Sequence, residues 1–126
     1  MKIKPQSYED LEVYQLAHRL AVEIHEMSLT ELPKFEMYEE GSQIRRSSKS
    51  VPANIVEGFG RKLYRNEYVQ YLTIALTHVD ETKEHLKLLF DTHSLKGEHR
   101  FKYFFEQYEI LGRKIFNFRK SIRLAT

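Results

Sequence analysis

The chain has 126 residues, of which 41% are hydrophobic and 30% are charged, and its formal net charge is +2. This composition predicts one folded domain, residues 1–126, with a hydrophobic core of its own. No apolar run approaches the roughly 20 residues of a membrane span, and none follows the amino terminus, so we expect neither a membrane helix nor a secretory signal and place the protein in the cytoplasm. The absence of cysteine excludes disulfides, thiolate metal sites and cysteine nucleophiles.

Charge alternates along the chain in four segments. Residues 1–42 carry a net charge of −5, residues 43–66 carry +5, residues 67–99 carry −3, and residues 100–126 carry +5. The two positive segments are therefore the ones that an anionic partner would meet, although the chain as a whole is nearly neutral.

The first predicted helix covers residues 7–29. Ser7 stands three residues before Asp10, which is a variant of the capping box with Asp in place of Glu. Apolar residues then recur at intervals of three or four, and the helix ends before Pro33 because the residue before a proline disfavours helical dihedrals.

The second predicted helix begins near Glu36, and Gly41 weakens its first turns. Pro52 cannot donate to the preceding turn, so we expect a kink there, and Gly58 and Gly60 end the helix. Its predicted inner face holds Ile44, Ser48, Val51, Ile55 and Phe59.

Two further helices complete the chain. Asn66 is the predicted N-cap of a third helix over residues 67–93, whose apolar stripe is interrupted at Thr82 and Lys83. A fourth helix covers residues 98–124, and no strand signal occurs anywhere. Four amphipathic helices joined by short links predict an all-α fold, an antiparallel up-down-up-down four-helix bundle.

The sequence carries little that points to catalysis. His78, Glu81 and His85 fall within about 60° of one helical face, an arrangement that could bind a divalent metal. A di-iron bundle, however, needs two Glu-x-x-His pairs, and none occurs, so a polar strip beside the core or a subunit contact is the favoured interpretation. No serine lies in a nucleophile elbow, and the glycines near residue 60 lack the remainder of a phosphate loop. We therefore predict no catalytic residues, metal, cofactor or small-molecule substrate.

Six cations are the candidate functional residues, and they lie in and just after the second helix. Their clustering is typical of sites that neutralise phosphates, with an affinity that falls as salt rises. Two alternatives are a solvated helix face whose cations pair with nearby acids, such as Glu57, and pairing with acids of a second copy. The six residues are Arg45, Arg46, Lys49, Arg61, Lys62 and Arg65.

Aromatic residues are numerous, with 8 tyrosines and 8 phenylalanines. Phe104 and Phe105 are adjacent, so both can hardly face the same core. Surplus aromatic surface is typical of association surfaces, and we therefore expect self-assembly.

One stretch resembles a family signature. Residues 43–61 read QIRRSSKSVPANIVEGFGR, which closely resembles the signature of the bacterial four helix bundle protein family. Its members include proteins encoded in intervening sequences of large-subunit ribosomal RNA genes. Residues 11–17 (LEVYQLA), Glu67, residues 72–75 (LTIA) and Glu81 fit the same family over about residues 8–95. The chain departs from it at Thr77-His78, where the family often has Gly-Ser, and at Thr82, where it often has Leu.

The resemblance implies an antiparallel four-helix bundle that assembles as a homopentameric ring with a basic face. The chain is similar to the accessory proteins of diversity-generating retroelements, which bind nucleic acid and partner with a reverse transcriptase. No catalytic residue or cofactor comes with the family.

Two hypotheses of function follow. The first is a non-enzymatic oligomer that binds structured RNA, such as ribosomal RNA, or another nucleic acid through the six cations. The alternative is a protein–protein interaction scaffold in which Arg45 and Arg46 form ion pairs between subunits, with the acidic first or third helix, and no nucleic acid binds.

Overall fold

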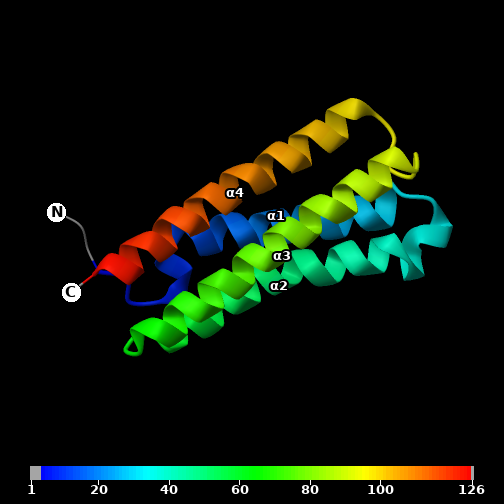
Figure 1. Ribbon diagram of the computed structural model, residues 1–126. Coiled ribbons are helices and arrows are strands. Elements are labelled where there is room, and N and C mark those ends of the chain that lie inside the picture. Colours follow the sequence, from blue (N-terminus) through cyan, green and yellow to red (C-terminus); the bar gives the residue numbers. More distant parts are fainter. Residues whose placement is uncertain (1–3, 126) are drawn as a thin grey trace.

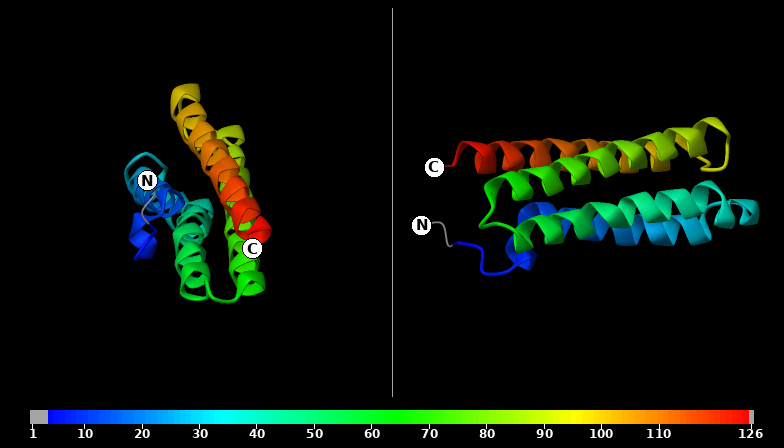
Figure 2. Two further views of the ribbon diagram at one scale, coloured as in Figure 1. Left: turned by 90° about the vertical axis from the view of Figure 1, so that its left-hand side faces the viewer. Right: turned by 60° about the horizontal axis from the view of Figure 1, so that its bottom comes forward.

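The computed structural model describes residues 4–125, and in this range the chain is built from helices without strands (Figure 1). This confirms the all-α prediction. Consecutive long helices run in opposite directions in Figure 1 and in the right-hand view of Figure 2, which is consistent with an up-down-up-down bundle. The elements are η1 (Tyr8–Asp10), α1 (Glu12–Thr30), η2 (Lys34–Tyr38), α2 (Glu40–Gly60), α3 (Arg65–Asp91) and α4 (Glu98–Leu124). None of these helices combines the length and the apolarity that crossing a membrane requires.

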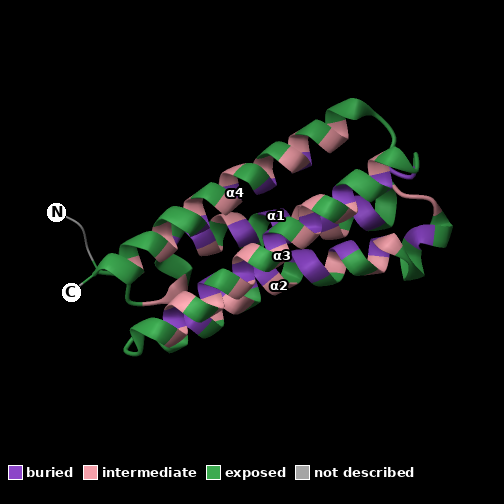
Figure 3. Ribbon diagram, in the orientation of Figure 1, coloured by how far each residue is buried: buried purple, intermediate pink, exposed green. Residues whose placement is uncertain are grey.

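The buried faces of the four long helices meet in one hydrophobic core (Figure 3). Leucine, isoleucine and valine side chains dominate it, and Phe104 and Tyr108 are its largest fully buried side chains. All five residues predicted on the inner face of the second helix are buried. The three- and four-residue periodicity therefore identified this face correctly.

The first helix begins later than predicted. The Ser7–Asp10 capping box is present, but it caps the 3-10 helix η1. Leu11 then adopts an extended conformation, with φ −76° and ψ 127°, and α1 begins at Glu12. This break turns the Leu11 side chain into the core, where it is almost fully buried.

The second helix also begins later than predicted, because Glu36 lies in η2. The Glu36 side chain is buried, accepts a hydrogen bond from the Glu40 backbone N–H at 3.3 Å, and accepts another from the Ser94 hydroxyl at 2.5 Å. One carboxylate therefore ties the start of α2 to the turn between α3 and α4. Gly41 is required at this point, since a Cβ there would overlap with the backbone carbonyl oxygen of Glu36.

α2 ends at Gly60, as predicted, and it includes Pro52. The kink expected at Pro52 stays a prediction. Gly58 serves the packing of α2 against α3, because a Cβ at this position would lie only 3.1 Å from both Tyr68 and Tyr71. Its small size therefore allows the two helices to approach closely.

The third helix begins and ends two residues earlier than the predicted range 67–93. Tyr64, and not Asn66, is the N-cap, so α3 begins at Arg65. α3 ends at Asp91, and His93 has a left-handed φ of 66°. Thr82 does not interrupt the buried face. It is fully buried, and its hydroxyl lies 2.8 Å from the Ser47 hydroxyl of α2.

The surplus aromatic residues of α3 and α4 pack against each other. Phe104 enters the core, whereas the half-buried Phe101 stacks on Phe90 with ring centroids 4.6 Å apart and contacts Phe105 at 5.3 Å. Part of the aromatic surface from which we predicted self-assembly is therefore used within the chain.

The close contact at Gly41 leads to a prediction on stability. We expect Gly41→Ala to lower the free energy of unfolding by about 1–3 kcal/mol, because the overlap with the Glu36 carbonyl outweighs the higher helix propensity of alanine. Gly60→Ala is the matched control, since a Cβ there has no neighbour within 4 Å, and it should be neutral or stabilising by up to about 1 kcal/mol. Urea unfolding followed by circular dichroism measures both, and equal stability of the two variants would refute the predicted overlap.

Candidate functional site

The six predicted cations form two separate groups. Arg45, Arg46 and Lys49 lie in the first half of α2, whereas the other three lie in or beside the turn between α2 and α3. Arg61 lies 16 positions after Arg45, which is about 24 Å along a helix at ~1.5 Å per residue. The structure therefore does not bring the six side chains to one binding surface.

Arg45 is a structural residue. Its Nη1 donates to the Ser28 hydroxyl of α1 at 2.9 Å, and its Nη2 donates to the backbone carbonyl of Met37 in η2 at 2.5 Å. The guanidinium thus joins three elements and is partly buried among them. This side chain is committed to the fold and cannot reach a ligand without breaking those bonds.

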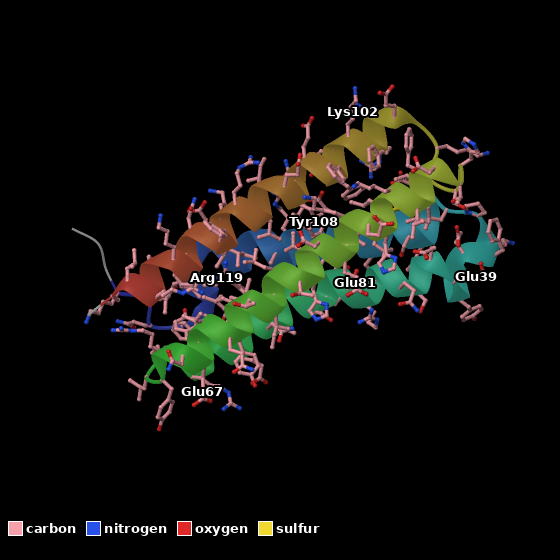
Figure 4. All side chains as sticks on the ribbon, in the orientation of Figure 1. Glu39, Glu67, Glu81, Lys102, Tyr108 and Arg119 are labelled. Carbon is pink, nitrogen blue, oxygen red and sulfur yellow. The ribbon has the colours of Figure 1, made fainter. Side chains whose placement is uncertain are left out.

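Arg46 takes part in an ion-pair network across α2 and α3. Its guanidinium pairs with the Glu81 carboxylate, which also lies 3.0 Å from Nδ1 of His78 and 3.4 Å from Nε2 of His85. Nδ1 of His85 lies 2.6 Å from the Glu40 carboxylate. Figure 4 shows Glu81 between the two helices.

The network explains why His78, Glu81 and His85 share one helical face. Both ring nitrogens of His85 contact carboxylates, and among the described residues no group of three His, Cys, Asp or Glu side chains is arranged to hold a metal ion. Burial raises the pKa of Glu81, but hydrogen bonds from His78 and His85 and the charge of Arg46 outweigh it and hold this pKa below its usual value. The cluster is therefore an Arg46–Glu81 ion pair with histidine contacts around it, and it links α2 to α3.

Lys49 is exposed and, within residues 4–125, makes no ion pair or hydrogen bond. It borders a cleft of about 360 Å³ between α1 and α2. The other residues that line this cleft are His18, Ala21, Val22, His25 and Pro52.

The turn between α2 and α3 presents its three cations to solvent. Arg61 pairs with Glu67 at 2.8 Å, and not with Glu57 as the pairing alternative proposed. Nζ of Lys62 lies 4.1 Å from the centre of the Phe59 ring. Arg65 is exposed and has no ion-pair partner in the part of the chain that the structure describes.

Four further cations, which are not among the six predicted ones, lie at the same end of the bundle. The α2–α3 turn, the end of α4 and the segment before α1 come together there (Figures 1 and 2). The resulting cluster is named the basic end. It consists of Lys4, Arg61, Lys62, Arg65, Arg119, Lys120 and Arg123.

Most of the basic end is free of ion pairs. Among its described members only Arg61 pairs with a carboxylate, whereas Arg119 donates to the Thr73 hydroxyl at 3.0 Å. Figure 4 shows Glu67 and Arg119 toward this end and Glu39 at the opposite one. The sequence did carry a signal for the α4 residues. Residues 100–126 have a net charge of +5, and the antiparallel order of the helices places the end of α4 beside the α2–α3 turn.

A cleft of about 560 Å³ opens at the basic end. Its apolar lining comes from α2, α3, α4 and the segments next to them, and three cations border it: Lys4, Lys62 and Arg65. The apolar residues of the lining include Leu11, Phe59, Leu63, Tyr68, Phe118 and Ile122.

Comparison with known proteins gives a family and a fold. The sequence profile of the 23S rRNA-intervening sequence proteins matches residues 9–117. The chain is similar to a solved structure from Bacteroides thetaiotaomicron, a protein of unknown function from the S23 ribosomal protein family, with 23% identity and a TM-score of 0.77. That match covers 86% of this chain and 95% of the other, and at this identity it shows the fold. No curated protein shows significant similarity to the chain.

The lowered pKa of Glu81 predicts how acid affects stability. Because the folded state favours the ionised carboxylate, its contribution is fully present above the ordinary value of 4.5 and is lost as the pH falls through the folded pKa. We expect the free energy of unfolding to fall between pH 5 and pH 3 by up to about 1 kcal/mol more in the wild type than in Glu81→Gln.

Glu84→Gln is the control for this comparison, since Glu84 is exposed on the same helix and has no ion-pair partner among the described residues. Denaturant unfolding at each pH measures the difference. If Glu81→Gln follows the same pH curve as Glu84→Gln, the network does not stabilise the fold.

The hydrogen bonds of Arg45 predict a role in stability. Arg45→Ala leaves the Ser28 hydroxyl and the Met37 carbonyl without this donor, so we expect the free energy of unfolding to fall by about 1–2 kcal/mol. Lys49→Ala, one turn further along α2, should change stability by less than about 0.5 kcal/mol. Thermal unfolding of both variants tests this, and an unchanged midpoint for Arg45→Ala would contradict the assignment.

Proposed function

The chain belongs to the 23S rRNA-intervening sequence protein family, and from this premise we propose that it binds structured RNA through the basic end without catalysing a reaction. The observation that carries the proposal is the gathering of seven cations from three parts of the chain, of which only Arg61 has a carboxylate partner among the described residues. Cations without such partners can approach phosphates without first breaking an ion pair, and they release counterions when they do so.

The proposal changes the set of residues that the sequence suggested. Arg61, Lys62 and Arg65 remain in it, and Lys4, Arg119, Lys120 and Arg123 join them. Arg45 leaves it because its guanidinium group is hydrogen-bonded to Ser28 and Met37, and Arg46 leaves it because it lies beside Arg45 in the first half of α2, away from the basic end, where it pairs with Glu81. Lys49 lies outside the basic end, and it would add at most one phosphate contact on the side of the bundle.

Self-assembly in the cytoplasm is part of the same proposal, and the family resemblance implies a ring of five copies. Its structural support is a set of large apolar side chains left exposed on the flanks of the bundle. These are Val22, Leu29, Leu88 and Phe116. A scaffold without RNA would use these flanks for its subunit contacts, since Arg45 and Arg46 already have partners in their own chain.

Replacing free cations should weaken RNA binding and its dependence on salt. For the double variant Lys62→Ala/Arg65→Ala we expect weaker binding to a folded ribosomal RNA fragment. The slope of log K against log salt concentration should also become shallower, by about 0.7–0.9 for each phosphate that the variant no longer neutralises. Fluorescence anisotropy across a salt series measures both quantities.

The charge-matched control is Lys34→Ala/Lys96→Ala, two exposed lysines at the opposite end of the bundle. It should bind like the wild type. Binding that is undetectable at low salt, or that the two double variants reduce equally, would refute the proposal.

A further inference from the structure

Two apolar side chains of the α2–α3 turn are exposed without serving the core. Leu63 is 88% exposed and Tyr64 is 64% exposed. They stand between Lys62 and Arg65, so cationic and apolar groups lie side by side along the turn. A turn that only joined two helices would be expected to carry polar residues at such positions.

The turn holds these side chains in a defined place. The backbone N–H groups of Arg61 and Lys62 donate to the carbonyls of Gly58 and Phe59 at 3.0 and 3.1 Å. The N–H of Tyr64 donates to the carbonyl of Arg61 at 2.8 Å. Because the backbone is already ordered, a ligand that covers Leu63 and Tyr64 has little loop entropy to overcome.

Leu63 also lines the cleft at the basic end, which continues this apolar surface inward. The cleft volume of about 560 Å³ lies in the range that accommodates a small molecule or a single residue of a partner. Lys62 and Arg65 border both the turn and the cleft. A matching occupant therefore combines a flat apolar part with negative charge beside it.

An unpaired nucleotide has this combination, because its base stacks on aromatic or apolar side chains while its phosphates contact cations. A continuous duplex does not, since its bases are already stacked on one another. We propose that unpaired nucleotides of the bound RNA stack on Tyr64 and Leu63, with their phosphates beside Lys62 and Arg65. This inference rests on the proposed function and adds the class of RNA: a loop, a bulge or a single-stranded end.

The test compares two RNAs that share one stem and have the same number of phosphates. One is a blunt duplex and the other is a hairpin with an unpaired loop. We expect the hairpin to bind at least about tenfold more tightly, because its unpaired bases can stack on Tyr64 and Leu63. Tyr64→Ala should remove most of that preference and leave the affinity for the duplex unchanged. Tyr64→Phe should keep the preference for the hairpin, because the aromatic ring remains.

Tyr38→Ala is the matched control, because Tyr38 is 88% exposed in η2 at the opposite end of the bundle. It should leave both affinities unchanged, and circular dichroism verifies that each variant is folded. Equal binding of hairpin and duplex, with no effect of Tyr64→Ala, would overturn this inference and leave the proposed function in place. Failure to bind either RNA at low salt would overturn both.

A protein contact at the turn gives a different result. Tyr64→Ala would then weaken self-association, measured by sedimentation velocity, without altering the preference between the two RNAs. That outcome would assign Leu63 and Tyr64 to an interface between copies of the chain and would overturn the inference.

Discussion

The close packing of α2 against α3 determines where the charged groups of this protein lie. Small or hydroxyl-bearing residues allow the two helices to approach closely. Gly58 of α2 packs against two tyrosines of α3, and the Ser47 hydroxyl is hydrogen-bonded to the Thr82 hydroxyl. The Arg46–Glu81 pair and its histidines close the same seam at the surface. Since α2 and α3 form an antiparallel hairpin, its turn projects from one end of the bundle, where α4 also ends (Figure 1).

This arrangement divides the cations by task. In the first half of α2, Arg45 and Arg46 bond to neighbouring elements and hold them together. The cations at the end of the bundle have few neighbours, so Lys62 and Arg65 remain available to a ligand. A single basic segment of sequence thus supplies both structural and candidate binding residues, and the antiparallel order adds a second basic segment from α4 to the latter.

Helical periodicity was enough to predict the four helices and the buried face of α2, because both depend on local spacing. The helix starts were not predictable in the same way. Leu11 leaves helical geometry to reach the core, and Glu36 is held in η2 by a contact with Ser94, 58 residues away. Thr82 looked like an interruption because its partner, Ser47, lies on another helix. Which of the six cations bond within the chain and which stay exposed likewise depends on tertiary neighbours, and the spacing of residues along the sequence does not predict these neighbours.

The central claim is that RNA meets this protein at the basic end. Photo-crosslinking of a folded ribosomal RNA fragment to the intact protein at low salt, followed by mass spectrometry of the crosslinked peptides, tests it most directly. Crosslinks should concentrate in residues 61–65 and 119–123, at the end where α2 and α4 finish. Crosslinks centred on residues 45–49, or on η2 at the opposite end, would contradict it.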